Sequence, residues 1–135
     1  MKAKLLTSLF VLAVILCVCS CQSKPEDLII GKWQMTELTT NSPEAENPDV
    51  KEFYAEMAKS SESIFNADLT CVNTVNSITT KGRWTILADG KQLHIIDDDS
   101  GSKSIMTIES ITSDCLVPTT KTEDIETKTV YTKVK

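Results

Sequence analysis

The hydrophobic residues of this 135-residue chain follow two different patterns, one in the first twenty residues and one from residue 28 onward. Residues 5–16 form an apolar run that is broken only by Thr7 and Ser8, and Lys2 and Lys4 precede it. A basic start, a short apolar run and small residues at its end are typical of a secretory signal. The run is too short to span a bilayer comfortably as a helix.

From residue 28 onward, apolar and polar residues alternate in short segments, as in strands that bury one face. In the first segment Trp33 and Met35 face one way, while Lys32 and Gln34 face the other. Turn-forming residues separate the segments. Strands are predicted at residues 28–40, 63–65, 69–75, 78–87, 91–96, 103–111, 115–120 and 127–134. About eight short strands at regular spacing predict an all-β, antiparallel up-and-down barrel.

One helix is predicted at residues 48–59, after the first strand and a polar loop at residues 41–49. Asn47 is a favourable N-cap, and Pro48 suits the first helical position. Four apolar side chains share one face of this helix: Val50, Phe53, Tyr54 and Met57. We interpret this face as a packing surface rather than a cofactor site.

Three of the five cysteines lie close together near the start, at positions 17, 19 and 21. The order Val18-Cys19-Ser20-Cys21 resembles the lipobox of bacterial lipoproteins. This resemblance implies that Cys21 is lipidated on its thiol and becomes the mature N-terminus. Each buried methylene of an acyl chain contributes about 0.8 kcal/mol to membrane attachment, and more than one chain makes the anchor stable.

Three segments follow from this interpretation: a signal peptide at residues 1–20, a lipidated cysteine and tether at 21–27, and a barrel domain at 28–135. An ordinary secreted protein with a chance cysteine cluster is the alternative. A metal site is disfavoured, because alternating cysteines without histidine lack zinc-ligand spacing.

The implied location is the bacterial cell envelope, with the membrane as a partner through the lipid anchor. The outer membrane is the expected site, on its periplasmic or its outer surface. Glu26 and Asp27 loosely resemble an export signal of one group of Gram-negative bacteria, in which acidic residues follow the lipidated cysteine. A plain solvated linker is an equally good interpretation of these residues.

If the signal is removed, Cys71 and Cys115 remain as thiols beside the lipidated Cys21. Outside the cytoplasm a disulfide between them is permitted. Two separately buried thiols are the alternative, because buried cysteine behaves as a small hydrophobic residue. Losing Lys2 and Lys4 leaves twelve basic and nineteen acidic residues, a net charge of −7. Such an acidic chain is a poor candidate for binding nucleic acid.

Two Gly-x-Trp units, Gly31-Lys-Trp33 and Gly82-Arg-Trp84, fall within predicted strands. Phe65-Asn-Ala-Asp-Leu-Thr70 lies between them, and Asp89-Gly-Lys-Gln-Leu-His-Ile95 follows the second. In this order, the four motifs resemble the bacterial lipocalin-like domain found in many small lipoproteins. The resemblance covers residues 28–134.

The resemblance implies a lipocalin-like barrel, in which Trp33 and Trp84 are structural residues that close the barrel floor. A glycine before each tryptophan would let the backbone pack closely. Leu69 stands where the family usually has glycine, which predicts a departure in that turn. The helix at residues 48–59 lies where lipocalins place a lid.

We expect no catalysis, because His94 is the only side chain that could act as a base at neutral pH. Its neighbours Leu93 and Ile95 are apolar, so alternation points His94 outward. The Asp97-Asp98-Asp99 run resembles a calcium loop only faintly, because Ile108 occupies the position of the ligand glutamate. We interpret it as a solvated hairpin turn, and we expect no metal and no cofactor.

Two functions without catalysis remain. One is the binding of a small lipophilic ligand inside the barrel, which the family resemblance favours. The other is a filled barrel that docks onto a protein partner in the cell envelope. The low aromatic content of 5% argues mildly against a rich apolar cavity.

Overall fold

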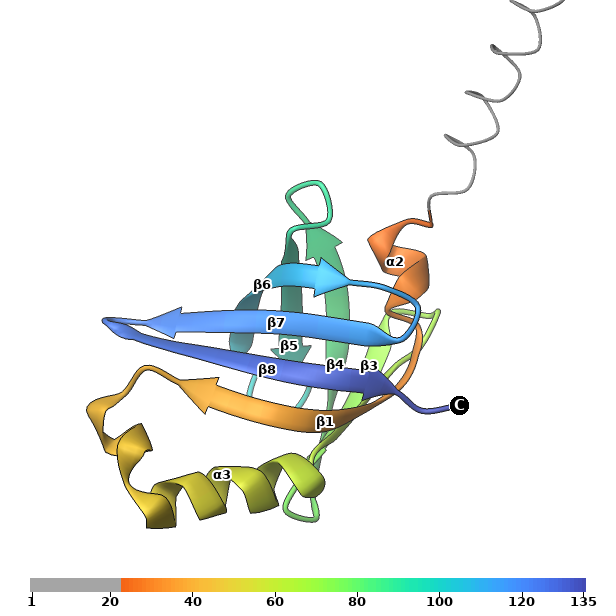
Figure 1. The fold of residues 1–135 in the computed structure, drawn as a ribbon. Coiled ribbons are helices and arrows are strands. Elements are labelled where there is room, and N and C mark those ends of the chain that lie inside the picture. The colour runs from red at the N-terminus through yellow and green to blue at the C-terminus, as the bar shows by residue number, and fades with distance from the viewer. Residues whose placement is uncertain (1–22) are drawn as a thin grey trace, which may run out of the picture.

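Eight antiparallel strands close into a barrel in the computed structural model, which describes residues 23–135 (Figure 1). Each strand pairs with the next along the chain, and the last pairs with the first. The predicted all-β, up-and-down fold is therefore confirmed. The strands are β1 (Gly31–Thr40), β2 (Glu62–Phe65), β3 (Thr70–Val75), β4 (Ile78–Leu87), β5 (Gln92–Asp97), β6 (Lys103–Ile111), β7 (Cys115–Thr122) and β8 (Ile125–Lys133).

Two register shifts bend the strands so that the sheet can close. One lies in β1 between Met35 and Glu37, opposite β8. The other lies in β6 between Ile108 and Ser110, opposite β7. An extra residue in one strand of a pair increases its local bend and twist. Closure also removes the exposed sheet edges that an open sheet would present.

The alternation of the sequence becomes an inside and an outside. Trp33 and Met35 are buried in the barrel, as predicted for the first strand. The buried core gathers at one end, where β1 begins and β2 ends, and we call this the closed end. The opposite end carries the β3–β4 hairpin at residues 76–77 and the β5–β6 hairpin at residues 98–102, and we call it the open end.

The predicted helix is present as α3 (Pro48–Lys59), with the predicted bounds. The side chain of Asn47 accepts a hydrogen bond from the backbone N–H of Asp49 at 2.9 Å, as a cap should. Two short helical segments, α2 (Pro25–Leu28) and η1 (Pro43–Glu46), were not predicted. Part of the expected tether is therefore helical. Pro25 packs against Gly90 of the β4–β5 turn, so α2 rests on the barrel.

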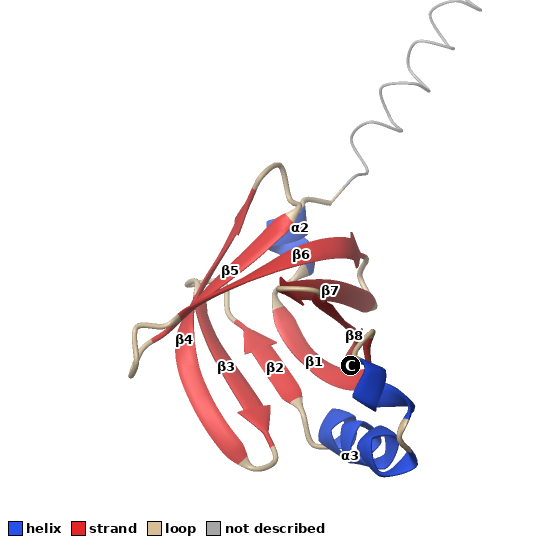
Figure 2. Ribbon diagram, turned by 90° about the vertical axis from the view of Figure 1, so that its left-hand side faces the viewer, coloured by secondary structure: helices blue, strands red, loops and turns tan. Residues whose placement is uncertain are grey.

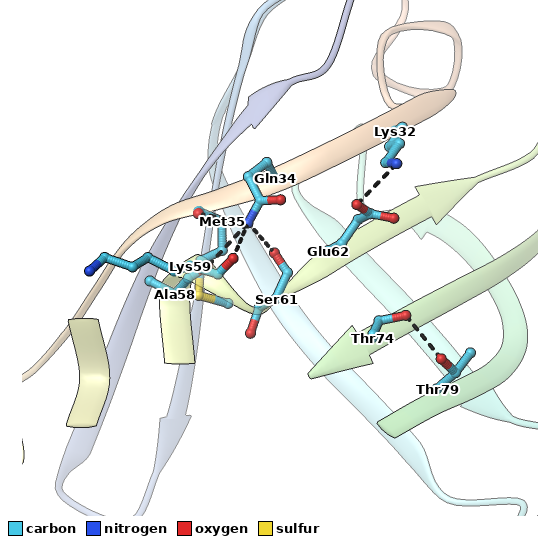
Figure 3. Close-up of polar contacts among 9 residues, drawn as sticks. All are labelled: Lys32, Gln34, Met35, Ala58, Lys59, Ser61, Glu62, Thr74 and Thr79. Atoms are coloured by element: carbon cyan, nitrogen blue, oxygen red, sulfur yellow. Dashed lines mark hydrogen bonds and ion pairs between the residues drawn. The ribbon is translucent and has the colours of Figure 1, made fainter. Parts of the chain in front are cut away.

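The α3 helix runs beside β1, away from α2 (Figure 2). Gln34, on the outer face of β1, joins the two elements. Its amide nitrogen lies 3.2 Å from the carbonyl oxygen of Ala58 and 2.9 Å from that of Ser61 (Figure 3). These contacts satisfy backbone acceptors where the helix ends.

The predicted apolar face of α3 packs only in part. Ala58 is its buried residue, and Val50, Tyr54 and Met57 are half-buried. Phe53 is 54% exposed, which contradicts its assignment to the packing face. The curved outer surface of a barrel meets a straight helix over a short length only, and that length lies near the C-terminal end of α3. No helix within residues 23–135 is long and apolar enough to cross a membrane.

The turn before β3 keeps a glycine-like backbone although leucine occupies it. Leu69 has φ of 71°, in the left-handed region that costs a residue with a Cβ about 1–2 kcal/mol. Leu69 therefore holds a backbone conformation that favours glycine. The carbonyl of Leu69 accepts a hydrogen bond from the backbone N–H of Trp84 at 2.9 Å, which ties the turn to β4.

Candidate ligand-binding cavity

A cavity of about 420 Å³ lies inside the barrel, toward the open end. Residues from β2 through β8, with Ser61 before them, line it. Ser100 and Ser102 of the β5–β6 hairpin belong to this lining and are exposed, so the cavity opens there. Clefts of roughly 300–1,000 Å³ are the usual size of small-molecule sites.

The floor of the cavity is apolar. Phe65, Leu93 and Leu116 line it and are buried in the core. The ring of Phe65 meets the edge of Trp84 at 6.0 Å between centroids and 88° between planes. Trp84 in turn donates its indole N–H to the carbonyl oxygen of Asn66 at 3.0 Å. The floor is therefore held in place by an aromatic pair whose polar group is satisfied.

Beneath this floor, Trp33 fills the closed end. Its indole N–H donates a 2.7 Å hydrogen bond to the carbonyl oxygen of Ile29, the residue after α2. The ammonium of Lys133 lies 5.0 Å from the centroid of the indole and donates to the carbonyl oxygen of Leu28 at 2.9 Å. Gly31 lies beside this lysine: a Cβ added there would come within 3.0 Å of the Lys133 Cε. These contacts give the first Gly-x-Trp unit a structural place.

Gly82, in the second Gly-x-Trp unit, lies in the wall of the cavity opposite Asp97 of β5. A Cβ at this position would overlap the backbone carbonyl oxygen of Ile96. The close approach of β4 and β5 therefore requires a residue without a side chain here. Trp84, two residues further along β4, faces the same way and is buried.

The wall toward the open end is rich in hydroxyl groups. Ser63, Thr80, Ser104, Thr120 and Tyr131 belong to five different strands, and all line the cavity. Burial raises the pKa of the Tyr131 phenol, while hydrogen bonds to Ser63 and Thr129 partly oppose that shift. At neutral pH the phenol is therefore uncharged and can donate a hydrogen bond.

Cys71 and Cys115, the cysteines within residues 23–135, are free thiols, so the disulfide between them is not formed in this structure. Cys71 is buried in β3 and Cys115 is half-buried at the start of β7, and those strands are not neighbours in the barrel. Burial, together with the nearby charge of Asp98, raises the pKa of the Cys71 thiol. Cys71 is therefore a packing residue of the core, as in the alternative prediction.

His94 lies on the face of β5 opposite to the cavity, because Leu93 and Ile95 both line the cavity. It is nevertheless only 8% exposed, and its Nε2 atom lies 3.1 Å from the side-chain oxygen of Gln92. Alternation therefore placed the side chain on the correct face but did not predict its burial.

The acidic run forms the β5–β6 turn. Asp97 Oδ1 accepts hydrogen bonds from the backbone N–H groups of Asp99 and Ser100, at 2.9 and 2.7 Å. The same oxygen accepts from the Ser100 hydroxyl at 3.0 Å. The bonds to Ser100 are the main cause of a lowered Asp97 pKa, so this carboxylate stays charged at neutral pH. Its role in the structure is to fix the turn.

Sequence reasoning missed the hydroxyl groups of the wall. Alternation alone places Ser63 on the face of Phe65, and Thr120 on the face of Leu116 and Pro118. Polar residues at inward positions near the end of each strand were the available signal. Cys21, the expected lipid site, lies outside the described residues.

Comparison with known proteins agrees with the barrel. The model of the lipocalin-like domain family matches residues 29–117. No curated protein matches the chain. Three solved structures from Bacteroides species are similar in fold, at 14–15% identity.

The first of these structures is a lipocalin-like protein from Bacteroides uniformis, with a TM-score of 0.54 over 79% of this chain and 99% of that one. The second is a DUF4847 family protein from Bacteroides vulgatus, with a TM-score of 0.56 over 82% and 96%. The third, from Bacteroides eggerthii, has a TM-score of 0.56 over 78% and 99%. Since the family model spans well over half of the residues and the barrel closes as that family requires, the chain belongs to the lipocalin-like domain family.

Proposed function

We propose that this protein binds a small, partly apolar molecule inside its barrel, and that a lipid on Cys21 holds it in the bacterial cell envelope. The cavity of about 420 Å³ above a buried apolar floor is the observation that carries the binding proposal. A molecule that covers Phe65, Leu93 and Leu116 would gain roughly 25 cal/mol for each Å² of apolar surface removed from water.

The position of the chain start gives the proposed anchor a direction. Ser23, the first described residue, leads into α2 at the closed end. Cys21 precedes it by two residues, and an extended chain spans at most about 3.6 Å per residue. A lipid on Cys21 would therefore hold the closed end near the bilayer, with the cavity mouth facing away from it. The ligand would then enter from the aqueous side.

Binding without conversion is the function that the lining supports. Most of its inward side chains are apolar or carry hydroxyl groups, Asp97 is held in the β5–β6 turn by hydrogen bonds, and His94 lies on the opposite face of β5. The competing idea of a docking protein assumed a barrel filled by its own side chains. The cavity supports ligand binding over that idea, so we place ligand binding first.

Native mass spectrometry of the purified protein tests the binding proposal. We expect a non-covalent adduct that is lost on denaturation. Thr120→Trp should lose the adduct by filling the cavity, whereas Lys121→Trp, on the exposed face of the same strand, should keep it. An adduct that survives in both variants, or that is absent from the wild-type protein even after incubation with apolar probes, would contradict binding in the barrel.

Metabolic labelling with palmitate tests the anchor. Cys21→Ser should abolish the label and release the protein from the membrane fraction. Cys115→Ser removes a half-buried thiol and should change neither result. Persistent labelling of the Cys21→Ser variant would show that Cys21 is not the attachment site.

A further inference from the structure

We propose that the cavity selects uncharged amphiphiles and rejects anionic ones such as fatty acids. In this arrangement the apolar part of the ligand covers the floor, and a head group with hydroxyl or ester oxygens lies against the hydroxyl-rich wall. This inference rests on the proposed ligand-binding function and adds the chemical class of the ligand. It rests on which charged side chains face the cavity and which face the outside of the barrel.

No basic side chain within residues 23–135 faces the cavity at an inward position of the wall. Lys81 belongs to the cavity lining, but like Arg83 it occupies an exposed position of β4 that alternates with the inward Gly82. Lys32 and Glu62 pair with each other at 3.1 Å (Figure 3). Glu62 also belongs to the lining, but it alternates with the buried residues Ser61 and Ser63, so its carboxylate belongs to the outer face. A ligand anion would therefore find no cation at an inward position of the wall.

Among the described residues, Asp97 is the one charged side chain at an inward position of the wall, since it shares the face of Leu93 and Ile95 on β5. One of its carboxylate oxygens is committed to the turn by three hydrogen bonds. A second negative charge near it would be repelled. A ligand that fills the cavity leaves little room for water to solvate an anion. Burying an unpaired carboxylate is therefore costly.

The hydroxyl groups of the wall suit an uncharged head group instead. A hydroxyl can both donate and accept, so Ser104, Thr120 and the neutral phenol of Tyr131 can form hydrogen bonds to ligand hydroxyl or ester groups. Among the described residues, no buried side-chain nitrogen or oxygen lacks a partner. Binding would combine hydrogen bonds to this wall with apolar contact at the floor.

The volume limits the size of such a ligand. A cavity of about 420 Å³ corresponds to about fourteen times the roughly 30 Å³ share of one water molecule. A short acyl or alkyl chain with a small polar head matches that volume, whereas a phospholipid with two long chains exceeds it.

Three probes with the same ten-carbon chain test the inference: 1-decanoyl glycerol, decanoate and decylammonium. Affinity is measured below the critical micelle concentration at pH 7.5, through the fluorescence of Trp84 and Trp33 and by calorimetry. We expect the glycerol ester to bind at least about tenfold more tightly than decanoate, because decanoate would bury an unpaired charge. Decylammonium should also bind more tightly than decanoate, because its charge is opposite to that of Asp97.

A matched pair of variants supplies the missing charge. Thr79 and Thr80 are exposed neighbours on β4. Thr80 lines the cavity. Thr79 lies on the other face of the strand, where its hydroxyl is 3.1 Å from that of Thr74 (Figure 3). Thr80→Lys should raise the affinity for decanoate about tenfold or more, because the new ammonium can pair with the carboxylate. Thr79→Lys adds the same net charge outside and should leave that affinity unchanged. Circular dichroism checks that both variants are folded.

Each outcome has a separate meaning. Decanoate binding the wild-type protein as tightly as the ester or as decylammonium would overturn the selectivity while leaving ligand binding intact. No binding of any probe, with no adduct in native mass spectrometry, would overturn the proposed function itself. An equal gain for Thr80→Lys and Thr79→Lys would show that overall charge, rather than the cavity wall, governs the anion.

Discussion

Gly82→Ala tests the close backbone approach between β4 and β5. The backbone of Gly82 lies outside the left-handed region, so alanine can adopt it without conformational strain. Its added methyl group would overlap the carbonyl oxygen of Ile96 and lie 3.5 Å from the Cα atom of Asp97. These are backbone atoms of the neighbouring strand, and no side-chain rotation can relieve the contact.

The magnitude follows from two opposing terms. Forcing an extra methyl group into a packed site costs about 1–3 kcal/mol. Replacing glycine by alanine restricts the unfolded chain, which returns about 0.4–1 kcal/mol. The free energy of unfolding should therefore fall by about 1–2 kcal/mol. For a domain near this size, that corresponds to a loss of about 4–8 °C in Tm.

Thermal unfolding and amide hydrogen exchange together provide the assay. Exchange should accelerate where β4 pairs with β5, at Arg83 and its partner Ile96. Gly101→Ala is the matched control, because its added methyl group meets nothing within 4 Å. That residue has φ of +71°, so its cost arises in the exposed hairpin, and exchange between β4 and β5 should not change.

A Gly82→Ala variant with the wild-type Tm and unchanged exchange would refute the reasoning. It would mean that β4 and β5 separate without cost and that glycine at this position is dispensable. A Tm loss equal to that of Gly101→Ala, without faster exchange between β4 and β5, would also contradict the steric explanation.

Three further predictions concern the core and α3. Because burial raises the pKa of Cys71, iodoacetamide should alkylate Cys71 more slowly than Cys115 in the folded protein. Peptide mass spectrometry measures the two rates, and faster labelling of Cys71 would contradict its burial. The raised pKa of Tyr131 favours the neutral phenol in the folded state. Its contribution to stability is complete below the ordinary pKa of 10.0 and is lost as pH rises through the higher folded-state pKa, so urea unfolding should show a decline above pH 10 that Tyr131→Phe removes. Gln34→Ala should lower the free energy of unfolding by about 1 kcal/mol, because the carbonyl groups of Ala58 and Ser61 lose a donor. Amide hydrogen exchange at the end of α3 should become faster. Unchanged exchange there would show that water replaces the amide without cost.

The strands and the helix were largely predictable because their signals are local. The bounds of β4, β6 and α3 agree with the sequence-based prediction. The end residues of the other strands differ by one to three positions, because pairing with neighbours extends or trims a strand end. The largest difference is at the start of β1, which was predicted at residue 28 but lies at Gly31, because Leu28 belongs to α2. The helix α2 was missed, since four residues carry too little periodicity, and its contact with Gly90 is long-range.

The candidate site depended much less on local signals. The two Gly-x-Trp units could be found by their residues, but the overlap that requires glycine at position 82 arises from β5. Phe53 matched the apolar face of its helix by spacing, and only the curvature of the barrel decided that it is exposed.

The sequence by itself determined the barrel, its strand order and which residues face inward, because alternation and turn chemistry act over a few neighbours. Only the tertiary structure decided that the barrel contains a cavity. A cavity is the volume left after seven strands place their side chains, so it depends on sums over residues far apart in the chain. The charge of the cavity wall also depends on residues far apart in the chain. The sequence is rich in lysine and acidic residues, yet closure turns nearly all of them outward and leaves hydroxyl groups around the opening.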